Sequence, residues 1–427
     1  MIVGKFDGKI LLELGTNVGS IDIVKYAKSE GAYVIVTDYL PIEKSEAKKY
    51  ADETAMISTL DVEAIYKYAK EKNIDGIFCG VSEAALEVVC EVAERLELPC
   101  YLNKQYFRLN QDKLYFKKMC QKYGIAAPKL FTVIENNIFE VAKQLQFPVV
   151  VKPNDQSSGT GVSICNSTEE LIKAYKNAQE LSKSNTAFVE EYIVGDEVTV
   201  VYSIKDGVVS LSCMTDKFLS QDHTDITSLN DVLIKPSHHL HSFISTQNDK
   251  VINFLKSELY TNGTVFLQGI YKDGLIYFIE MGCRMSGGAD YRIIEHENGI
   301  SFMKMLVDYA LLGSCEDFDI SRDNPHFKTY SGNFKLIAHG GQIGKMTGVE
   351  EVRLLDGVLY ANFRKSIGDI IPEDGSLRQY IFECFFSCST LIEVSNLICK
   401  IQYLVKVENI NGDNMLFKPF DVSRLLV

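Results

Sequence analysis

The chain has 427 residues, of which 46% are hydrophobic and 24% are charged, and these proportions predict a globular protein of two or three domains. No apolar run reaches the roughly eighteen residues of a membrane-spanning helix, and the N-terminus lacks a basic stretch before a long apolar core, so we expect neither membrane insertion nor secretion. The net charge of −13 argues against nucleic-acid binding, and it means that a site for a polyanion must gather its cations locally. Eleven cysteines without CxxC spacing are typical of reduced thiols in a cytoplasmic protein.

Strands and helices alternate through the first hundred residues. Strands are expected at 9–14, 33–37 and 74–79, and helices are expected to begin with the capping residues Ser20, Asp61 and Ser82. Such alternation predicts a parallel sheet covered by helices. The glycine turn after the first strand lacks the GxGxxG spacing, so a dinucleotide site is not favoured there.

The most informative stretch lies near the middle of the chain. An apolar strand at 147–151 delivers Lys152, and a loop of small residues precedes a second strand at 162–165. The loop consists of Ser157, Ser158, Gly159, Thr160 and Gly161. Its backbone N–H groups can converge on a polyanion while the lysine meets the charge, although a plain glycine hairpin would have the same residues.

A second element follows some thirty residues later. An apolar strand enters the hinge sequence Glu190-Glu191-Tyr192-Ile193, and Gly-x-Glu-x-Thr-Val follows with Glu197 as its acid. Together with Lys152 and the Ser/Gly loop, this order resembles the ATP-grasp superfamily, whose members hold ATP between two α+β subdomains. The resemblance covers residues 109–313.

The resemblance implies a mixed α/β and α+β protein in three parts. Residues 1–108 would form a parallel βα pre-grasp domain, and residues 109–322 the ATP-grasp domain with a lid at about 126–191. Residues 323–427 would form a small C-terminal β-rich domain.

The resemblance also implies ATP as cofactor and a role for each matching residue. Lys113 and Lys152 would hold the phosphates under the loop from Ser157 to Gly161, with Ser158 close to the reacting phosphoryl group. Glu190 would accept from the adenine amine, main-chain groups of Glu191 and Ile193 would read the ring edge, and Glu197 would bind the ribose.

A β-hairpin is predicted at 264–281, and it carries two polar residues on otherwise apolar strands. Gln268 and Glu280 are costly there unless something binds them, and Mg²⁺ prefers such oxygen ligands. The resemblance implies that they hold Mg²⁺, with Mn²⁺ as an alternative, and that Arg284 faces the transferred phosphoryl group. Gly282 stands where the family usually has an asparagine, which puts a two-metal arrangement in doubt.

Three other segments carry expectations. A helix should begin at Asn110 or Gln111, and residues 218–241, with four of the seven histidines, should be an irregular loop that does not favour zinc. In the C-terminal part, helices are expected at 376–388 and 390–399 and a strand at 401–408.

The function implied is an ADP-forming ligase that activates a small carboxylate as an acyl phosphate and transfers it to an amine, with a homodimer allowed. Two alternatives stay open. The glutamine at 268 also fits a bicarbonate-activating enzyme, and the glycine at 282 also fits a weakly catalytic ATP-binding regulator.

Overall fold

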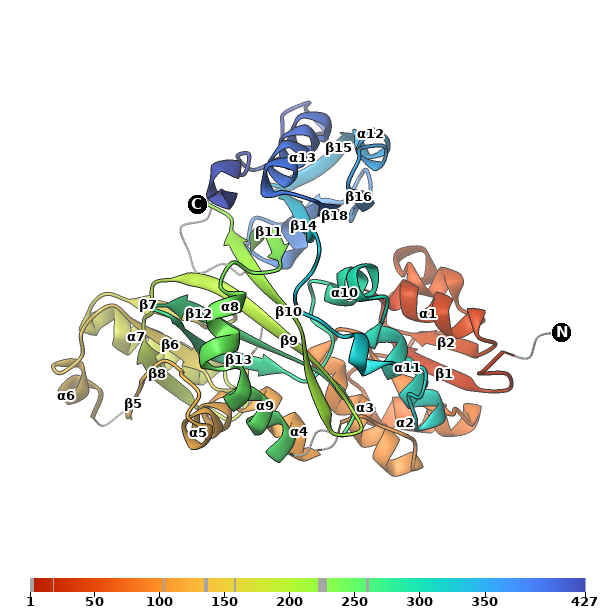
Figure 1. Cartoon of the computed structure of the whole chain (residues 1–427), viewed down its shortest axis with the longest axis horizontal. Coiled ribbons are helices and arrows are strands. Elements are labelled where there is room, and N and C mark those ends of the chain that lie inside the picture. The colour runs from red at the N-terminus through yellow and green to blue at the C-terminus, as the bar shows by residue number, and fades with distance from the viewer. Residues whose placement is uncertain are drawn as a thin grey trace.

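The computed structural model describes residues 4–17, 19–102, 104–133, 137–156, 159–221, 229–258 and 261–426. Four regions are visible in Figure 1, with the N-terminal domain at the right, the lid at the left, a large sheet in the centre and the C-terminal part above it. Within the described residues, no helix is both long and apolar enough to cross a bilayer.

The N-terminal domain is the predicted parallel sheet, in the order β3-β2-β1-β4. Its strands are β1 (Ile10–Leu14), β2 (Tyr33–Thr37), β3 (Glu53–Ala55) and β4 (Gly76–Phe78), and its helices are α1 (Ser20–Ser29), α2 (Val62–Lys72) and α3 (Glu83–Leu96). Asp61 and Ser82 cap α2 and α3 as predicted, each accepting from a backbone N–H. Ser20 does not cap α1, because Gly19 is the N-cap and the Ser20 hydroxyl donates to the buried carboxylate of Glu13.

Two helices connect this domain to the lid. They are α4 (Lys104–Gln111) and α5 (Lys113–Tyr123). The predicted helix start at Asn110 or Gln111 is wrong, because one helix ends there and Asp112 caps the next by accepting from the Tyr115 N–H at 2.9 Å.

The lid is a four-stranded sheet in the order β5-β8-β6-β7. Its strands are β5 (Leu130–Phe131), β6 (Val149–Pro153), β7 (Ser163–Cys165) and β8 (Ala187–Glu191), and its helices are α6 (Ile138–Ala142) and α7 (Thr168–Leu181). The lid has an apolar core of its own, whereas the N-terminal domain shares one core with the central sheet. Such a division allows the lid to move as a unit.

The central sheet has eight strands in the order β13-β12-β9-β10-β11-β14-β18-β16. The strands are β9 (Asp196–Lys205), β10 (Val208–Leu219), β11 (Asn230–Lys235), β12 (Gly263–Lys272), β13 (Leu275–Gly282), β14 (Tyr330–Ile337), β16 (Val358–Phe363) and β18 (Tyr380–Cys388). Four helices accompany them, α8 (Leu240–Thr246), α9 (Asn248–Ser257), α10 (Asp290–Asn298) and α11 (Phe302–Leu312). Because β11 pairs with β14, the sheet continues across the boundary predicted at residue 322.

The remaining C-terminal elements form a small sheet in the order β17-β15-β19, with two helices. They are β15 (Gly341–Thr347), β17 (Ile370–Ile371), β19 (Lys406–Asn409), α12 (Val349–Arg353) and α13 (Leu391–Leu404). The predicted helix at 376–388 is wrong, because this aromatic-rich segment is β18 and pairs on both sides, with β14 and β16. The strand expected from residue 401 begins only at Lys406, because α13 continues to Leu404.

The described residues of the stretch at 218–241 lie mostly in regular elements, so the expected irregular loop is wrong for them. β10 runs to Leu219, β11 is a buried strand in the middle of the sheet, and α8 begins at Leu240. His223 lies outside the described residues.

Candidate functional site

The strand register divides the central sheet into two chemically different faces. Directly paired residues on antiparallel strands point to the same face, and neighbours along a strand point to opposite faces. Gln268 pairs with both Glu280 and Thr199, and Glu197 pairs with Lys217. The same face continues through Leu233 and Asn333 to Lys335. We call this side of the sheet the polar face.

The predicted metal ligands are direct cross-strand partners on this face. Gln268 of β12 lies opposite Glu280 of β13, and both are half-buried. Among the described residues, neither side chain has a hydrogen bond or an ion pair. Two free oxygen ligands on a sheet face fit the donor set that Mg²⁺ takes when phosphates and waters supply the rest.

Gly282 at the end of β13 is explained by a close aromatic contact. A Cβ built at this position would lie 2.3 Å from Cζ of Phe266, its partner on β12. The guanidinium carbon of Arg284 lies 5.0 Å from the centre of the same ring. An asparagine at 282 would therefore displace Phe266, and the ring occupies the space that such a side chain would need.

Arg284 is anchored from the N-terminal domain. Its guanidinium lies 2.7 Å from the Glu83 carboxylate at the start of α3 and also donates to the Met285 carbonyl at 2.9 Å. The Nε atom is buried and has no hydrogen-bond partner among the described residues. The N-terminal domain thus orients a cation at the end of the strand that carries Glu280.

On the lid side, Glu190 is the centre of a buried ion cluster. Its carboxylate contacts Lys152 of β6 and lies 2.6 Å from Lys117 of α5, and the Glu190 side chain is only 1% exposed. Burial alone would raise the pKa of Glu190, but the charges of Lys152 and Lys117 outweigh it and hold that pKa below its usual value. Glu190 was expected to accept from adenine. Instead, its two oxygens face lysines.

Lys117 is the cluster member that the sequence reasoning missed. Burial lowers its pKa, although the Glu190 charge opposes the change. Lys117 lies one helical turn after Lys113 on α5, so both lysines share one face of the helix, and this spacing was the available signal.

Lys113 lies at the base of the predicted phosphate loop. Its ammonium group donates to the Gln156 carbonyl, directly before that loop. Ser157 and Ser158 lie outside the described residues. Gly159 and Gly161 both have positive φ angles, and a Cβ at Gly161 would lie 2.7 Å from Cγ of Pro153, so the turn requires glycine there. Thr160, between them, is exposed.

The hinge between lid and sheet contains the remaining predicted residues. Glu191 is exposed and its N–H donates to the Lys129 carbonyl, whereas Ile193 is buried. Glu197 lies 2.7 Å from Lys217, its partner on β10. The structure therefore places Glu197 on the polar face but pairs it with a lysine that the sequence reasoning did not single out.

Comparison with known proteins agrees with this arrangement. The family model described as the C-terminal domain of D-ala D-ala ligase matches residues 119–228. A D-alanine–D-alanine ligase from Fervidobacterium nodosum is 31% identical over 187 residues, covering 42% of this chain and 58% of the relative. A carbamoyl phosphate synthase large chain from Clostridium beijerinckii is 23% identical over 73% of this chain, which spans only 29% of that relative.

Solved structures extend the likeness over nearly the whole chain. The L-amino acid ligase from Bacillus licheniformis has a TM-score of 0.77 at 18% identity, covering 94% of this chain and 99% of its own. Phosphoribosylglycinamide synthetase from Anaerococcus prevotii has a TM-score of 0.75 at 20% identity, with the same coverage. The matching family model, the ligase relative and the solved structures all indicate the ATP-grasp superfamily.

A group of cations continues the polar face away from Gln268 and Glu280. Lys335 of β14 is 6% exposed, and burial together with the nearby charge of Arg364 lowers its pKa to about 7. Lys217 and Lys235 contribute to the same lowering, and the Lys335 ammonium group lies 3.2 Å from the Asn230 amide oxygen. Lys217, Lys235 and Lys335 come from separate strands and Arg364 directly follows β16, and carboxylates of the described residues pair with all of them except Lys335.

Proposed function

We propose that this protein is an ATP-dependent ligase that phosphorylates a small carboxylate and transfers the resulting acyl group to an amine, with release of ADP and phosphate. The observation that carries the proposal is the pairing of Gln268 with Glu280 on the polar face, without protein partners in the described part of the chain. The cations at the same face and the lid lysines support it. The substrates are small molecules, with amino acids as the first candidates.

Each residue has a positioning or charge-neutralising role in the proposal. Lys113 and Lys152 hold the phosphates beneath the loop at 157–161, and Ser158 of that loop donates to the reacting phosphoryl group. Glu190 fixes the Lys152 ammonium group, and both of its oxygens face lysines. Main-chain groups of Glu191 and Ile193 therefore recognise adenine in its place. Glu197 accepts from the ribose hydroxyls.

Glu280 and Gln268 would hold a divalent cation, Mg²⁺ or Mn²⁺, which neutralises charge on the phosphate oxygens when bound. A substrate carboxylate oxygen attacks the γ-phosphorus, and the bond from that phosphorus to the β–γ bridging oxygen breaks, so ADP leaves. The amine nitrogen then attacks the acyl carbon, the bond to the phosphate oxygen breaks, and the amine gives up its proton. Arg284 stabilises the oxygen charge in both steps.

Trapping of the acyl phosphate tests the proposal. The full chain is incubated with ATP, Mg²⁺, hydroxylamine and a panel of amino acids and dipeptides, and hydroxamate and ADP are measured. Hydroxamate should form in step with ADP for the accepted carboxylate. ADP formation without a trappable product, for every carboxylate that stimulates it, would contradict the proposal.

A second candidate is a bicarbonate-activating enzyme. The glutamine at 268 and the likeness to carbamoyl phosphate synthase chains and to a biotin carboxylase from Campylobacter jejuni, with a TM-score of 0.74 at 18% identity, favour it. ATP hydrolysis stimulated by bicarbonate, with no amino-acid requirement, would select this candidate. ATP binding without turnover across the whole panel would instead indicate a regulator.

A further inference from the structure

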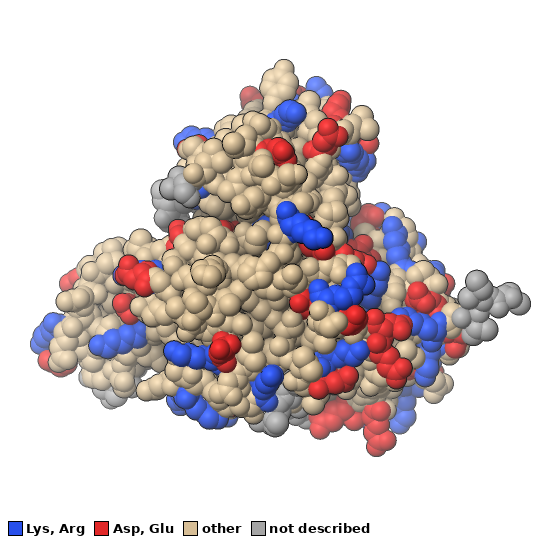
Figure 2. Space-filling view, viewed as in Figure 1, with Lys and Arg blue, Asp and Glu red and all other residues tan. Residues whose placement is uncertain are grey.

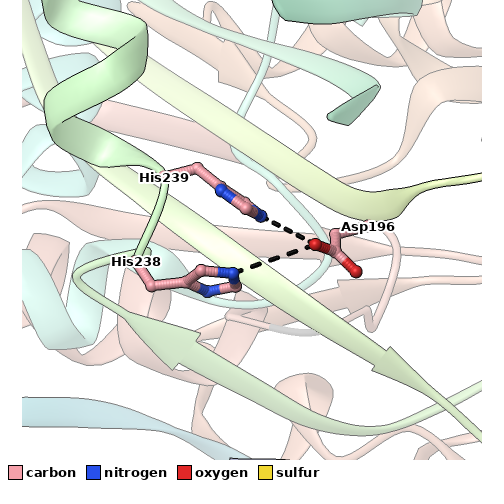
Figure 3. A group of neighbouring side chains, drawn as sticks. All are labelled: Asp196, His238 and His239. Carbon is pink, nitrogen blue, oxygen red and sulfur yellow. Dashed lines mark hydrogen bonds and ion pairs between the residues drawn. The ribbon is translucent and has the colours of Figure 1, made fainter. Parts of the chain in front are cut away.

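The opposite face of the central sheet carries a cluster that the proposed function does not use. Asp196 begins β9, and His238 and His239 lie in the connection between β11 and α8. Figure 3 shows both imidazoles directed at the Asp196 carboxylate. One Asp196 oxygen lies 2.8 Å from Nε2 of His239 and 3.8 Å from Nε2 of His238.

The ligand spacing suits a small divalent cation. Ligand atoms about 2.0–2.1 Å from a tetrahedral zinc ion lie roughly 3.3 Å from one another. The two nitrogen–oxygen distances fall on either side of that value, and the three ligand atoms all lie within 4.8 Å of one another. A shift of about half an ångström in each ring would therefore give three ligands of a tetrahedral site.

A buried carboxylate behind the cluster fixes one of the rings. Asp216 of β10 has a side chain that is 8% exposed, and its carboxylate lies 2.6 Å from Nδ1 of His238. It also accepts from the His238 N–H at 2.9 Å and from the Ser237 hydroxyl at 2.5 Å. A carboxylate on Nδ1 leaves the Nε2 lone pair of His238 for a metal, which is the usual second-shell arrangement for a metal-bound histidine.

The second ring is fixed by stacking. The His239 ring lies 3.5 Å from the Tyr271 ring at an angle of 19°, and 3.6 Å from the His238 ring. The side chains of His238 and Asp196 are 53% and 62% exposed, so solvent can supply further ligands.

We propose that Asp196, His238 and His239 form a binding site for one transition-metal ion of the zinc class, separate from the Mg²⁺ position at Glu280. Two imidazoles and one carboxylate match zinc and its neighbours in the first transition row, whereas Mg²⁺ prefers oxygen ligands alone. The ion would join the start of β9 to the segment before α8. Since Glu197 follows Asp196 directly and points to the polar face, the ion would hold β9 in place beneath the nucleotide.

Metal titration of the full chain tests this site. The protein is stripped with a chelator, dialysed and titrated with Co²⁺, whose visible absorption reports nitrogen ligation, and Zn²⁺ is then added as competitor. One Co²⁺ should bind per chain, Zn²⁺ should displace it, and Mg²⁺ should not. Asp196→Asn and His238→Ala should each weaken binding tenfold or more, and Asp216→Asn about 10–100-fold through the ring that it orients.

Three controls separate this site from other metal-binding groups. His241→Ala removes a histidine of the same segment outside the cluster, and Cys399→Ser removes the exposed thiol, so both should bind Co²⁺ normally. Glu280→Gln should also bind it normally, which makes the result independent of the proposed ligase activity.

Thermal unfolding gives a second readout if a variant binds poorly because it folds poorly. Zn²⁺ should raise the Tm of the unaltered protein and leave the Tm of Asp196→Asn unchanged, while the two stripped proteins unfold at similar temperatures. Absence of one-to-one Co²⁺ or Zn²⁺ binding, or normal binding by both Asp196→Asn and His238→Ala, would overturn the proposal.

Discussion

The two faces of the central sheet hold different chemistry although they share the same strands. β9 sends Glu197 to the polar face and Asp196 to the helix-covered face, and β10 does the same with Lys217 and Asp216. On the polar face, carboxylate and amide oxygens stand beside lysines. On the other face, carboxylates stand beside histidines. One sheet can therefore serve an oxygen-ligated and a nitrogen-ligated cation, because successive residues of a strand point to opposite faces.

Figure 2 views the molecule from the same side as Figure 1, in which α8 lies in front of the sheet. Charged side chains crowd over the N-terminal domain, whereas the centre of this view is largely uncharged. The polar face, in contrast, gathers Lys217, Lys235, Lys335 and Arg364 around Lys335.

The largest expected effect comes from removing the carboxylate of the polar face. Glu280→Gln should nearly abolish turnover, because Glu280 is the one carboxylate in the predicted metal position, while nucleotide binding through the hinge at 191–193 persists. Turnover and nucleotide affinity are measured against Mg²⁺ concentration.

Gln268→Glu is the matched change on the partner strand. It should be tolerated or should strengthen Mg²⁺ dependence at low metal concentration, because it adds a hard anionic ligand to the same pair. If Gln268→Glu abolished turnover while Glu280→Gln preserved it, the assignment of Gln268 and Glu280 as metal ligands would be wrong.

The next largest effect should come from the lid. Lys152→Ala should reduce turnover roughly 10²–10³-fold if the ammonium group acts as a preorganised donor to the phosphates. It also leaves Glu190 with Lys117 alone, so the unfolding free energy is measured in parallel. Unchanged turnover and ATP affinity would contradict the role of Lys152.

A smaller effect should come from the contact between Gly282 and Phe266. Gly282→Asn should destabilise the fold by about 1–3 kcal/mol, because its side chain overlaps the Phe266 ring. Phe266→Ala in the same chain should recover part of that loss by making room. Urea unfolding compares the single and the double variant with the unaltered chain, and full stability of Gly282→Asn alone would contradict the explanation.

A pH dependence of stability should come from Lys335. Its folded pKa of about 7 lies below the ordinary lysine value of 10.5, so between these values the unfolded chain holds a proton that the folded chain lacks. The unfolding free energy should therefore rise with pH through that window, by up to about 1.4 kcal/mol per pH unit.

Lys335→Met removes the titrating group at similar volume, and its stability should be flatter between pH 7 and 10. Urea unfolding of both proteins at several pH values gives the comparison. If stability changed with pH in the same way in both proteins, the folded protein would keep Lys335 charged. The neighbouring cations on the polar face would then not lower the Lys335 pKa.

Local patterns were enough to predict the main elements of the candidate site and two helix caps. The strand before Lys152, the hairpin with Gln268 and Glu280, and the caps Asp61 and Ser82 each rest on neighbours within a few residues. The family resemblance was confirmed by the comparisons. The residue roles within the site stay predictions.

Other features depend on pairing between distant segments, which one sequence does not reveal. β11 is short and lies in a polar stretch, and it is stabilised by β10 and β14 on its two sides. The aromatic run of β18 was mistaken for a helix because its partners lie about fifty residues before it and twenty before it. Zinc was not favoured at the histidines because CxxC-type partners are missing and the segment was not expected to be helical. Their contact with Asp196, some forty residues earlier, is another pairing between distant segments.

The most direct test of the two-faced sheet is to measure both cation sites in one variant, Glu280→Gln. Steady-state turnover against Mg²⁺ and Co²⁺ titration of the stripped protein are recorded for this variant and for the unaltered chain. The account predicts that turnover is nearly lost while one-to-one Co²⁺ binding is unchanged. Near-normal turnover by Glu280→Gln, or loss of its Co²⁺ binding, would contradict the account.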